Sequence, residues 1–489
     1  MTHRASYSGC RWHDRRLFVT DPTVTPDRIL PSDNPHRFGP ILVALVICQL
    51  MIILDVTVVN VALPSIRADL EFTATGLSWV SNAYTLAFGG LLLLGARAGD
   101  LIGRRTTFVA GLALFTAASL AGGLAPGAGW LITARVAQGI GAALAGPNAL
   151  ALLTTIFTDP DRRMRALAWY SGMAGVGFAV GLVVGGLLTE WATWRSVLLI
   201  NVPLGAASIG LTLRHIPQPP RRPARLDARG ALAATAGIAA LVFGFLSAAE
   251  PERSNSAIIG ALGAGVVLIL LFLAIERRAR QPLLPLRLFA DRNRAVAYTN
   301  VFVCYMASMS MFFFLTLYLQ NVRGMSPVAT GFAFLPTAVL MFALIRAVPV
   351  LLRKFGPKLV TMTGAVSMVA GLLLLTRLTT ETSYFPVIFA AAALMGCGTG
   401  LALMPLAMII MADIPTDLAG AAGGAAQTIQ QLGAALGLAI LVSVFGAFTD
   451  GTADPLNSVM VTGITAAFVA ASVMATTTLL GTFLFRSRV

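Results

Sequence analysis

The sequence has few charged residues for its length. Of its 489 residues only 11% are Asp, Glu, Lys or Arg, whereas 57% are hydrophobic. A soluble globular chain carries about 25% charged residues, and a chain this long would need a large polar surface. The composition therefore excludes soluble and disordered proteins and predicts that lipid is the main solvent.

Cysteine and histidine are also scarce. The four cysteines include no CxxC pair, which argues against a disulfide framework or a sulfur-ligated metal. None of the four histidines falls in a long apolar run. Metal-dependent enzymes need clustered ligands, so we expect a protein that is not an enzyme and has no metal or other cofactor. The sequence also has no P-loop motif, which disfavours ATP-driven pumping by this chain.

The charges that are present are mostly basic, with 35 Lys and Arg against 21 Asp and Glu. They form short clusters between apolar runs, which favours a lipid surface over nucleic acid as the partner. Residues 1–38 hold six arginines and no apolar segment. We therefore expect a cytoplasmic tail there and not a signal peptide.

Apolar runs long enough to cross a membrane recur along the chain. A spanning helix needs about 20 mostly apolar residues. Fourteen runs satisfy this requirement, namely 41–61, 77–97, 107–126, 130–156, 166–188, 194–213, 228–248, 256–277, 295–320, 329–352, 358–377, 384–411, 421–447 and 458–484. The prediction is an all-α membrane protein with fourteen transmembrane helices.

The basic residues predict the orientation of these helices. If the N-terminus is cytoplasmic, 28 of the 35 Lys and Arg residues lie on the inner side and five on the outer side. Basic residues concentrate in cytoplasmic loops. We therefore expect a multi-pass protein of the plasma membrane with both termini in the cytoplasm.

The spans divide into two sets of six with a pair between them. The pair lies in 214–294, flanked by basic clusters, and it separates 39–213 from 295–485; residues 486–489 form a short cytoplasmic tail. Matching positions carry Gly103-Arg104 in one set and Gly356-Pro357 in the other. The similarity predicts two parallel six-helix bundles around a midplane site, plus two inserted central helices.

Asp55 is the one carboxylate far from the ends of any predicted span. It lies roughly 21 Å in from the cytoplasmic side by helix rise, where an ionised carboxylate costs about 2.5–3.5 kcal/mol. Such a group can take up a proton and release it as water access alternates. The alternative is a permanent structural pair with Arg135. Arg135 lies only about five residues in from the outer edge of its span, so its side chain could instead snorkel to the membrane surface.

Three strings carry a family resemblance. The first is Leu54-Asp55-Val56-Thr57-Val58-Val59-Asn60-Val61-Ala62-Leu63-Pro64, the second runs from Gly95 to Arg105, and the third, 131–143, contains Arg135. Together they resemble the fourteen-spanner drug:proton antiporters of the major facilitator superfamily. The resemblance implies the major facilitator fold and efflux of hydrophobic or cationic drugs by alternating access. It further implies that the proton motive force drives transport, with Asp55 and Arg135 in proton coupling.

The second string is similar to the superfamily's cytoplasmic loop signature. Asp100, Gly103, Arg104 and Arg105 match it, and the resemblance implies a cytoplasmic gate at these four residues. Simple retention of basic residues on the inner side accounts for the arginines but not for the Asp-x-x-Gly spacing.

The fifth span carries Gly177, Gly181, Gly185 and Gly186. The first three recur every four residues, so they share one helix face that lets a neighbouring helix approach closely. The related motif has a proline where this chain has Leu182, so the kink that a proline would give is not expected here.

Other polar and aromatic residues in the spans are candidates for a substrate cavity. They are Thr57, Asn60, Tyr84, Gln138, Asn201, Tyr305, Gln427 and Gln431. Hydrogen bonding between helices is the alternative role for the polar ones. Arg346 also falls within a span, and either its side chain snorkels to the interface or it contacts lipid or substrate.

The expected partners are a drug-like small molecule, a proton and the lipid bilayer, with no nucleic acid. One fourteen-helix chain suffices for a transport path, so a functional monomer is expected. Two alternatives remain open: an exporter of one metabolite or antibiotic, and an uncoupled facilitator or sensor with the same fold.

Overall fold

The computed structural model describes residues 35–73, 75–218, 227–249, 254–279, 282–414, 418–449 and 457–485. The predicted tails 1–38 and 486–489 lie almost wholly outside these residues. The described part is helical, with elements α1 (Pro35–Leu70), α2 (Ser78–Ile102), α3 (Arg104–Gly123), α4 (Ala128–Ile156), α5 (Pro160–Trp191), α6 (Trp194–Leu199), α7 (Asn201–His215), α8 (Ala228–Ser247), α9 (Asn255–Arg278), η2 (Leu286–Phe289), α10 (Arg292–Leu317), η3 (Tyr318–Val322), α11 (Pro327–Ala333), α12 (Leu335–Leu375), η4 (Tyr384–Ile388), α13 (Phe389–Met411), α14 (Ala419–Phe448) and α15 (Asn457–Phe483).

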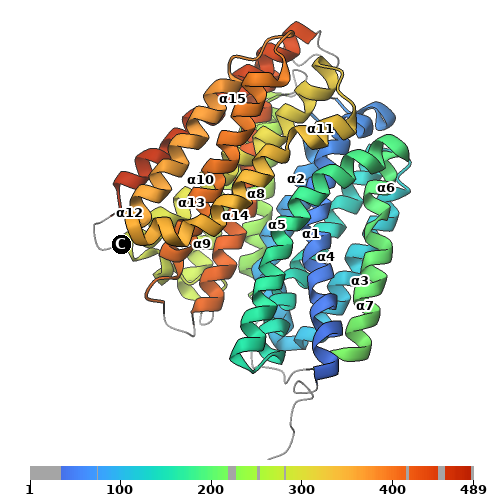
Figure 1. Cartoon of the computed structure of the whole chain (residues 1–489), viewed down its shortest axis with the longest axis vertical. Helices are drawn as coiled ribbons and strands as arrows, with labels where there is room; N and C mark the ends of the chain where they lie inside the picture. Colours follow the sequence, from blue (N-terminus) through green and yellow to red (C-terminus); the bar gives the residue numbers. More distant parts are fainter. Residues whose placement is uncertain are drawn as a thin grey trace, which may run out of the picture.

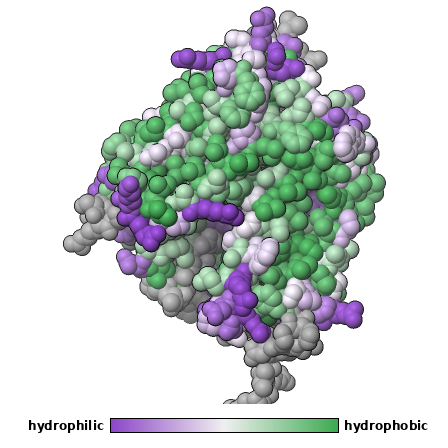
Figure 2. Space-filling view, in the orientation of Figure 1, coloured by the Kyte–Doolittle hydropathy of each residue, from purple (hydrophilic) through white to green (hydrophobic). Residues whose placement is uncertain are grey.

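Fourteen helical stretches in the described residues are long and apolar enough to cross a membrane, which confirms the predicted number. Figure 2 shows apolar side chains covering most of this face, with hydrophilic residues at its two ends, on its left flank and in one short stretch near the centre. The sixth predicted span is divided into α6 and α7 at Ile200. The tenth covers α11 and the first part of α12, and a kink at Gly356 inside α12 separates it from the eleventh, between the predicted runs 329–352 and 358–377. We call the end of the molecule where α1 begins the basic end, and the opposite end the far end (Figure 1).

The chain turns at two matched glycines. Gly103 separates α2 from α3 with φ +116°, and Gly356 interrupts α12 with φ +74°. Residues with a Cβ rarely adopt positive φ, so glycine permits both turns. These are the positions at which the two halves of the sequence resemble each other.

Helix packing repeats between the halves. A Cβ added at Gly141 of α4 would lie 2.6 Å from the backbone nitrogen of Phe115 in α3. In the second half, a Cβ at Gly398 of α13 would lie 2.8 Å from the backbone nitrogen of Met368 in α12. Each half therefore brings two backbones into close contact at corresponding places, as expected for two parallel six-helix bundles.

The inserted pair, α8 and α9, packs together, and α8 also contacts α2 and α14. Thr235 of α8 lies against Gly90 of α2, and Ser443 of α14 donates a hydrogen bond to the carbonyl of Phe245 in α8. One inserted helix thus touches both bundles. The exact limits 39–213, 214–294 and 295–485 stay a prediction.

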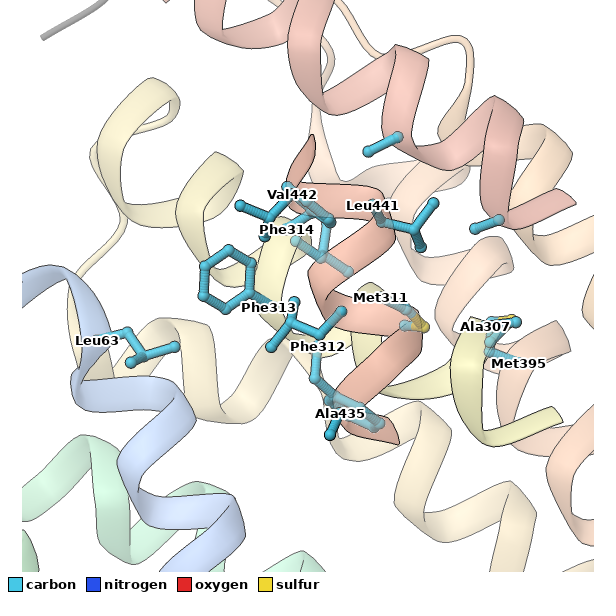
Figure 3. Packing of buried hydrophobic residues seen from close by; sticks show 14 of the residues in the cluster. Leu63, Ala307, Met311, Phe312, Phe313, Phe314, Met395, Ala435, Leu441 and Val442 are labelled. Atoms are coloured by element: carbon cyan, nitrogen blue, oxygen red, sulfur yellow. The ribbon is translucent and has the colours of Figure 1, made fainter. Parts of the chain in front are cut away.

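Aromatic side chains fill the centre of the second half. Phe312, Phe313 and Phe314 follow one another on α10, and Phe314 packs in a tilted arrangement against Phe445 of α14 with ring centroids 5.6 Å apart. Figure 3 shows this run between α14 and Leu63 of α1. The core of the second half therefore continues to the first helix.

The two halves are joined at the far end. Gln320 Nε2 donates to the backbone carbonyl of Val61 at 2.8 Å. The backbone N–H of Val328 donates to Glu190 Oε2 at 3.0 Å. These bonds connect α1 and α5 of the first half to η3 and α11 of the second, so this conformation is closed at the far end.

Candidate functional site

Asp55 and Arg135 form a buried ion pair inside the first half. Arg135 Nη1 lies 2.5 Å from Asp55 Oδ2, and both residues are 1% exposed. The pair joins α1 to α4. Burying one such charge without its partner costs about 3–5 kcal/mol, so each side chain depends on the other in this conformation.

Gln138 completes the environment of the carboxylate. Its Nε2 donates to Asp55 Oδ1 at 3.0 Å, and its Oε1 accepts from Arg135 Nη1 at 3.0 Å. Gln138 Nε2 also donates to Ser119 Oγ on α3 at 2.8 Å. Two side chains of α4 thereby bond the two carboxylate oxygens, and Ser119 of α3 holds one of those side chains in place.

The guanidinium of Arg135 has two further contacts on α2. Its Nε donates to the backbone carbonyl of Val80 at 2.9 Å, and its Cζ lies 4.5 Å from the centre of the Tyr84 ring. A cation over an aromatic face is attracted to the ring. Arg135 is therefore fixed from three sides and does not snorkel toward the membrane surface.

A narrow pocket opens beside this pair, between the two halves. One wall comes from the first half and is mostly polar; the opposite wall, from α10 and α14, consists of Met309, Ala434 and Leu438. The first-half residues that line the pocket are Val56, Asn60, Ser81, Asn82, Tyr84, Thr85 and Arg135. Arg135 therefore borders a space that faces both bundles, and its partner Asp55 lies outside the lining itself.

Three of the eight predicted cavity residues take part in this site. Asn60 and Tyr84 line the pocket, and Gln138 bonds to Asp55. Thr57 donates to the carbonyls of its own helix at Ile53 and Leu54.

The other four lie elsewhere. Asn201 is buried at the start of α7, Tyr305 is partly buried on α10, and Gln427 is exposed on α14. Gln431 packs against Gly89 of α2, where the two halves touch.

The glycine face of α5 packs against α1. An added Cβ at Gly181 would lie 2.0 Å from Thr57 Oγ1, and one at Gly185 would lie 2.9 Å from the Cα of Val58. The second half repeats this arrangement: a Cβ at Gly437 of α14 would lie 2.4 Å from the Cα of Met306 in α10. The helix that carries Asp55 is thus held against α5 by backbone contact.

The predicted gate residues are bonded within the first half. Arg104 Nη2 lies 3.0 Å from Asp100 Oδ1, and its Nη1 donates to Thr155 Oγ1 of α4 at 2.6 Å. Arg105 donates to the carbonyl of Leu213 at the end of α7. The gate itself stays a prediction, because all of these partners belong to one bundle.

Two expectations concern sites elsewhere. Arg346 is exposed on α12 and lies outside the pocket lining. Over the ranges that the structure describes, no three His, Cys, Asp or Glu side chains gather as metal ligands would.

Sequence reasoning missed Ser81, Asn82 and Thr85. They precede or follow Tyr84 on α2, and nothing in their spacing distinguishes them from other polar residues in the spans. Their common feature is the wall that they form with Asn60 of α1. This arrangement depends on how α1 and α2 pack together, so the sequence of α2 alone could not predict it.

Two helical bundles around a central pocket with one polar and one apolar wall, and a buried ion pair at its edge, are typical of a secondary membrane transporter. The profile of the Major Facilitator Superfamily matches residues 45–438. The chain therefore belongs to the Major Facilitator Superfamily.

Relatives within this family include exporters and resistance proteins. The cephamycin export protein CmcT of Amycolatopsis lactamdurans is 40% identical over 413 residues, covering 83% of this chain and 85% of the relative. The puromycin resistance protein pur8 of Streptomyces alboniger is 40% identical over 418 residues, covering 84% and 82%.

The fold is similar to that of solved transporters. An auto-inhibited POT family peptide transporter has a TM-score of 0.67 at 14% identity, covering 92% of this chain and 98% of the other. A bacterial homologue of the human lysosomal transporter Spinster has a TM-score of 0.64 at 17% identity, again covering 92% and 98%. At this identity the likeness concerns the fold alone.

Proposed function

We propose that this chain is a proton-coupled exporter of antibiotic-like compounds, with Asp55 as the proton carrier. The observation that carries the proposal is the buried Asp55–Arg135 pair at the edge of a pocket whose walls come from both halves. A carboxylate in that position can exchange a proton with the space through which the substrate passes. The cephamycin and puromycin relatives support export of this class of compound.

Protonation of Asp55 would change the forces between α1 and α4. When Asp55 is ionised, its two oxygens accept from Arg135 and Gln138. A proton on Asp55 removes the charge attraction and leaves Arg135 with the Val80 carbonyl, Gln138 and the Tyr84 ring. Because α5 packs closely on α1, a shift of α1 relative to α4 would reach the contacts between α5 and α11 at the far end.

The orientation belongs to the same proposal. The basic end would face the cytoplasm, so this conformation, which is closed at the far end, would admit substrate from inside the cell. Both termini would be cytoplasmic, and one chain would suffice for transport in the plasma membrane. Transport, with no chemical step, is the whole activity.

The test is uphill efflux in a bacterial host that lacks its own drug pumps. Accumulation of ethidium and of puromycin would be followed for wild type, for wild type with a protonophore, and for Asp55→Asn. Asp69→Asn is the matched control, because Asp69 lies on the same helix but outside the pocket lining. Membrane levels of each variant would be measured in the same cells.

We expect wild type and Asp69→Asn to expel both compounds, and we expect the other two arms to fail. Uphill efflux by Asp55→Asn would overturn the role of Asp55. Efflux that survives the protonophore and only equilibrates the compound would indicate an uncoupled facilitator. Efflux of one compound but not the other would indicate a narrow exporter.

A further inference from the structure

The amide of Asn82 is buried beside the pocket without a hydrogen-bond partner. Asn82 is 1% exposed, and neither its Oδ1 nor its Nδ2 bonds to any residue that the structure describes. The hydroxyls of Ser81 and Tyr84, which line the same pocket, also lack partners within the described ranges. Three side chains of α2, at positions 81, 82 and 84, thus offer unused donors and acceptors along one pocket.

Such groups are costly unless something satisfies them. An unpaired buried polar group costs about 1–3 kcal/mol. Two other asparagines of the first half do have partners: Asn60 Nδ2 donates to the Val56 carbonyl at 2.7 Å, and Asn148 Nδ2 donates to the Gly95 carbonyl at 2.9 Å. Asn82 differs from them because both polar atoms of its amide lack a partner while the residue lines the pocket.

The pocket has no net charge to attract an ion when Asp55 is ionised. Arg135 is the charged residue of the lining, and Asp55 neutralises it at 2.5 Å. The other residues of the first-half wall are uncharged. Across the pocket, Met309, Ala434 and Leu438 provide an apolar surface. A molecule that fits both walls has an apolar body and an uncharged polar edge.

We propose that Asn82, together with Ser81 and Tyr84, forms a substrate subsite that binds an uncharged hydrogen-bonding group, such as a carboxamide or a hydroxyl, on an otherwise apolar compound. This inference rests on the proposed function, because the pocket is taken as the substrate site. It adds the substrate class and names a residue that discriminates among substrates. An amide can donate and accept hydrogen bonds at the same time, so the Asn82 side chain can bind either a carboxamide or a hydroxyl group.

The test is binding to purified protein in lipid nanodiscs, measured by calorimetry without a proton gradient. Chloramphenicol is the uncharged probe, since it carries an amide and hydroxyl groups. Tetraphenylphosphonium is the comparison, because it is a permanent cation with no hydrogen-bonding group. The variants are Asn82→Leu, which removes the amide, and Asn82→Gln, which keeps it.

Asn300→Leu is the matched control. Asn300 is 2% exposed and its Nδ2 is also unpaired within the described residues, but it lies on α10 outside the pocket lining. We expect Asn82→Leu to weaken chloramphenicol binding about tenfold and to leave tetraphenylphosphonium within about twofold of the wild-type protein. Asn82→Gln should retain most of the chloramphenicol affinity, and Asn300→Leu all of it.

Several results would overturn the subsite. One is that Asn82→Leu loses affinity for both probes equally. Another is that chloramphenicol binding is unchanged in that variant. A third is that the wild-type protein does not bind chloramphenicol. Because no gradient is applied, failure of proton coupling leaves this result unaffected. Conversely, loss of the subsite would not remove uphill efflux of compounds without hydrogen-bonding groups.

Discussion

The backbone carbonyl of Leu182 on α5 lies against Gly331 of α11, where a Cβ added to the glycine would stand 2.3 Å from that oxygen. Leu182 occupies the position at which the related motif has a proline. The residue that departs from the motif therefore lies at the contact between the two halves. A kink in α5 is not needed for this contact, because the missing side chain of Gly331 provides the space.

Gly331→Ala should separate the halves at the far end. The added methyl group meets backbone on the opposite helix, which cannot move aside as a side chain can. We expect efflux to fall about tenfold, which corresponds to about 1.4 kcal/mol. A cysteine placed at Val328, whose bond to Glu190 runs through its backbone N–H, in a chain without the four native cysteines, should become more reactive toward an impermeant maleimide.

Gly129→Ala is the control for this variant, since a Cβ at Gly129 meets nothing within 4 Å. It should change neither efflux nor labelling. Unchanged labelling in Gly331→Ala would show that the far end does not depend on this contact.

The ion pair can be separated into a structural and a coupling contribution. Arg135→Gln leaves Asp55 buried without its charge partner, so we expect a marked fall in the thermal unfolding midpoint of the purified protein. The double variant Asp55→Asn with Arg135→Gln has no buried charge and should recover much of that midpoint. Uphill efflux should stay absent in both variants.

Thermal unfolding of the purified protein and efflux in cells must be measured for the same set of variants. If the double variant regains stability but not uphill efflux, the ion pair is needed for proton coupling and not for folding. Recovery of uphill efflux would instead mean that Asp55 and Arg135 serve the fold, and the proton carrier would have to be another group.

Much of the fold follows from local sequence signals, and the site follows from them only in part. Fourteen apolar runs predict fourteen spans because each helix must satisfy its own backbone in lipid. Asp55 and Arg135 stand out because deep charges are costly and need a partner. Asn82 does not stand out, since its role depends on which residues of α1, α10 and α14 lie opposite. Gln427 is predicted as a cavity residue by its polarity, yet it is exposed and lies outside the pocket lining, although Gln431 one turn further on contacts α2.

The packing of α5 on α1 predicts that a second substitution can restore the function lost by a first one. Gly181→Ala places a methyl group 2.0 Å from Thr57 Oγ1, and we expect reduced efflux and a lower unfolding midpoint. Adding Thr57→Ala removes the obstructing hydroxyl, so the double variant should recover most of both quantities.

Gly185→Ala is the contrasting case on the same helix face. Its methyl group would meet the Cα of Val58 at 2.9 Å, and backbone cannot be trimmed by substitution. Adding Thr57→Ala should therefore give no recovery in this variant. If Thr57→Ala rescued both glycine variants equally, the effect would come from general loosening of α1 and not from the local contact.

The pair of Asp100 and Arg104 tests whether the basic end contains a gate. Their side chains are 24% and 18% exposed, so the ion pair contributes only about 0–1 kcal/mol to stability. Asp100→Asn should therefore leave the unfolding midpoint nearly unchanged. If Asp100 also holds the basic end shut in the alternate conformation, efflux should fall about tenfold in spite of the retained stability.

Asp159→Asn is the comparison, since Asp159 is an exposed carboxylate that caps α5 through the Arg162 N–H at 2.8 Å. Loss of that cap should lower the unfolding midpoint slightly. Efflux per molecule of folded protein should equal that of the wild type. If Asp100→Asn and Asp159→Asn reduce efflux by the same small amount, Asp100 acts only within its own bundle. A selective loss of efflux in Asp100→Asn would place it at the gate, because the bonds of the present conformation are too weak to account for it.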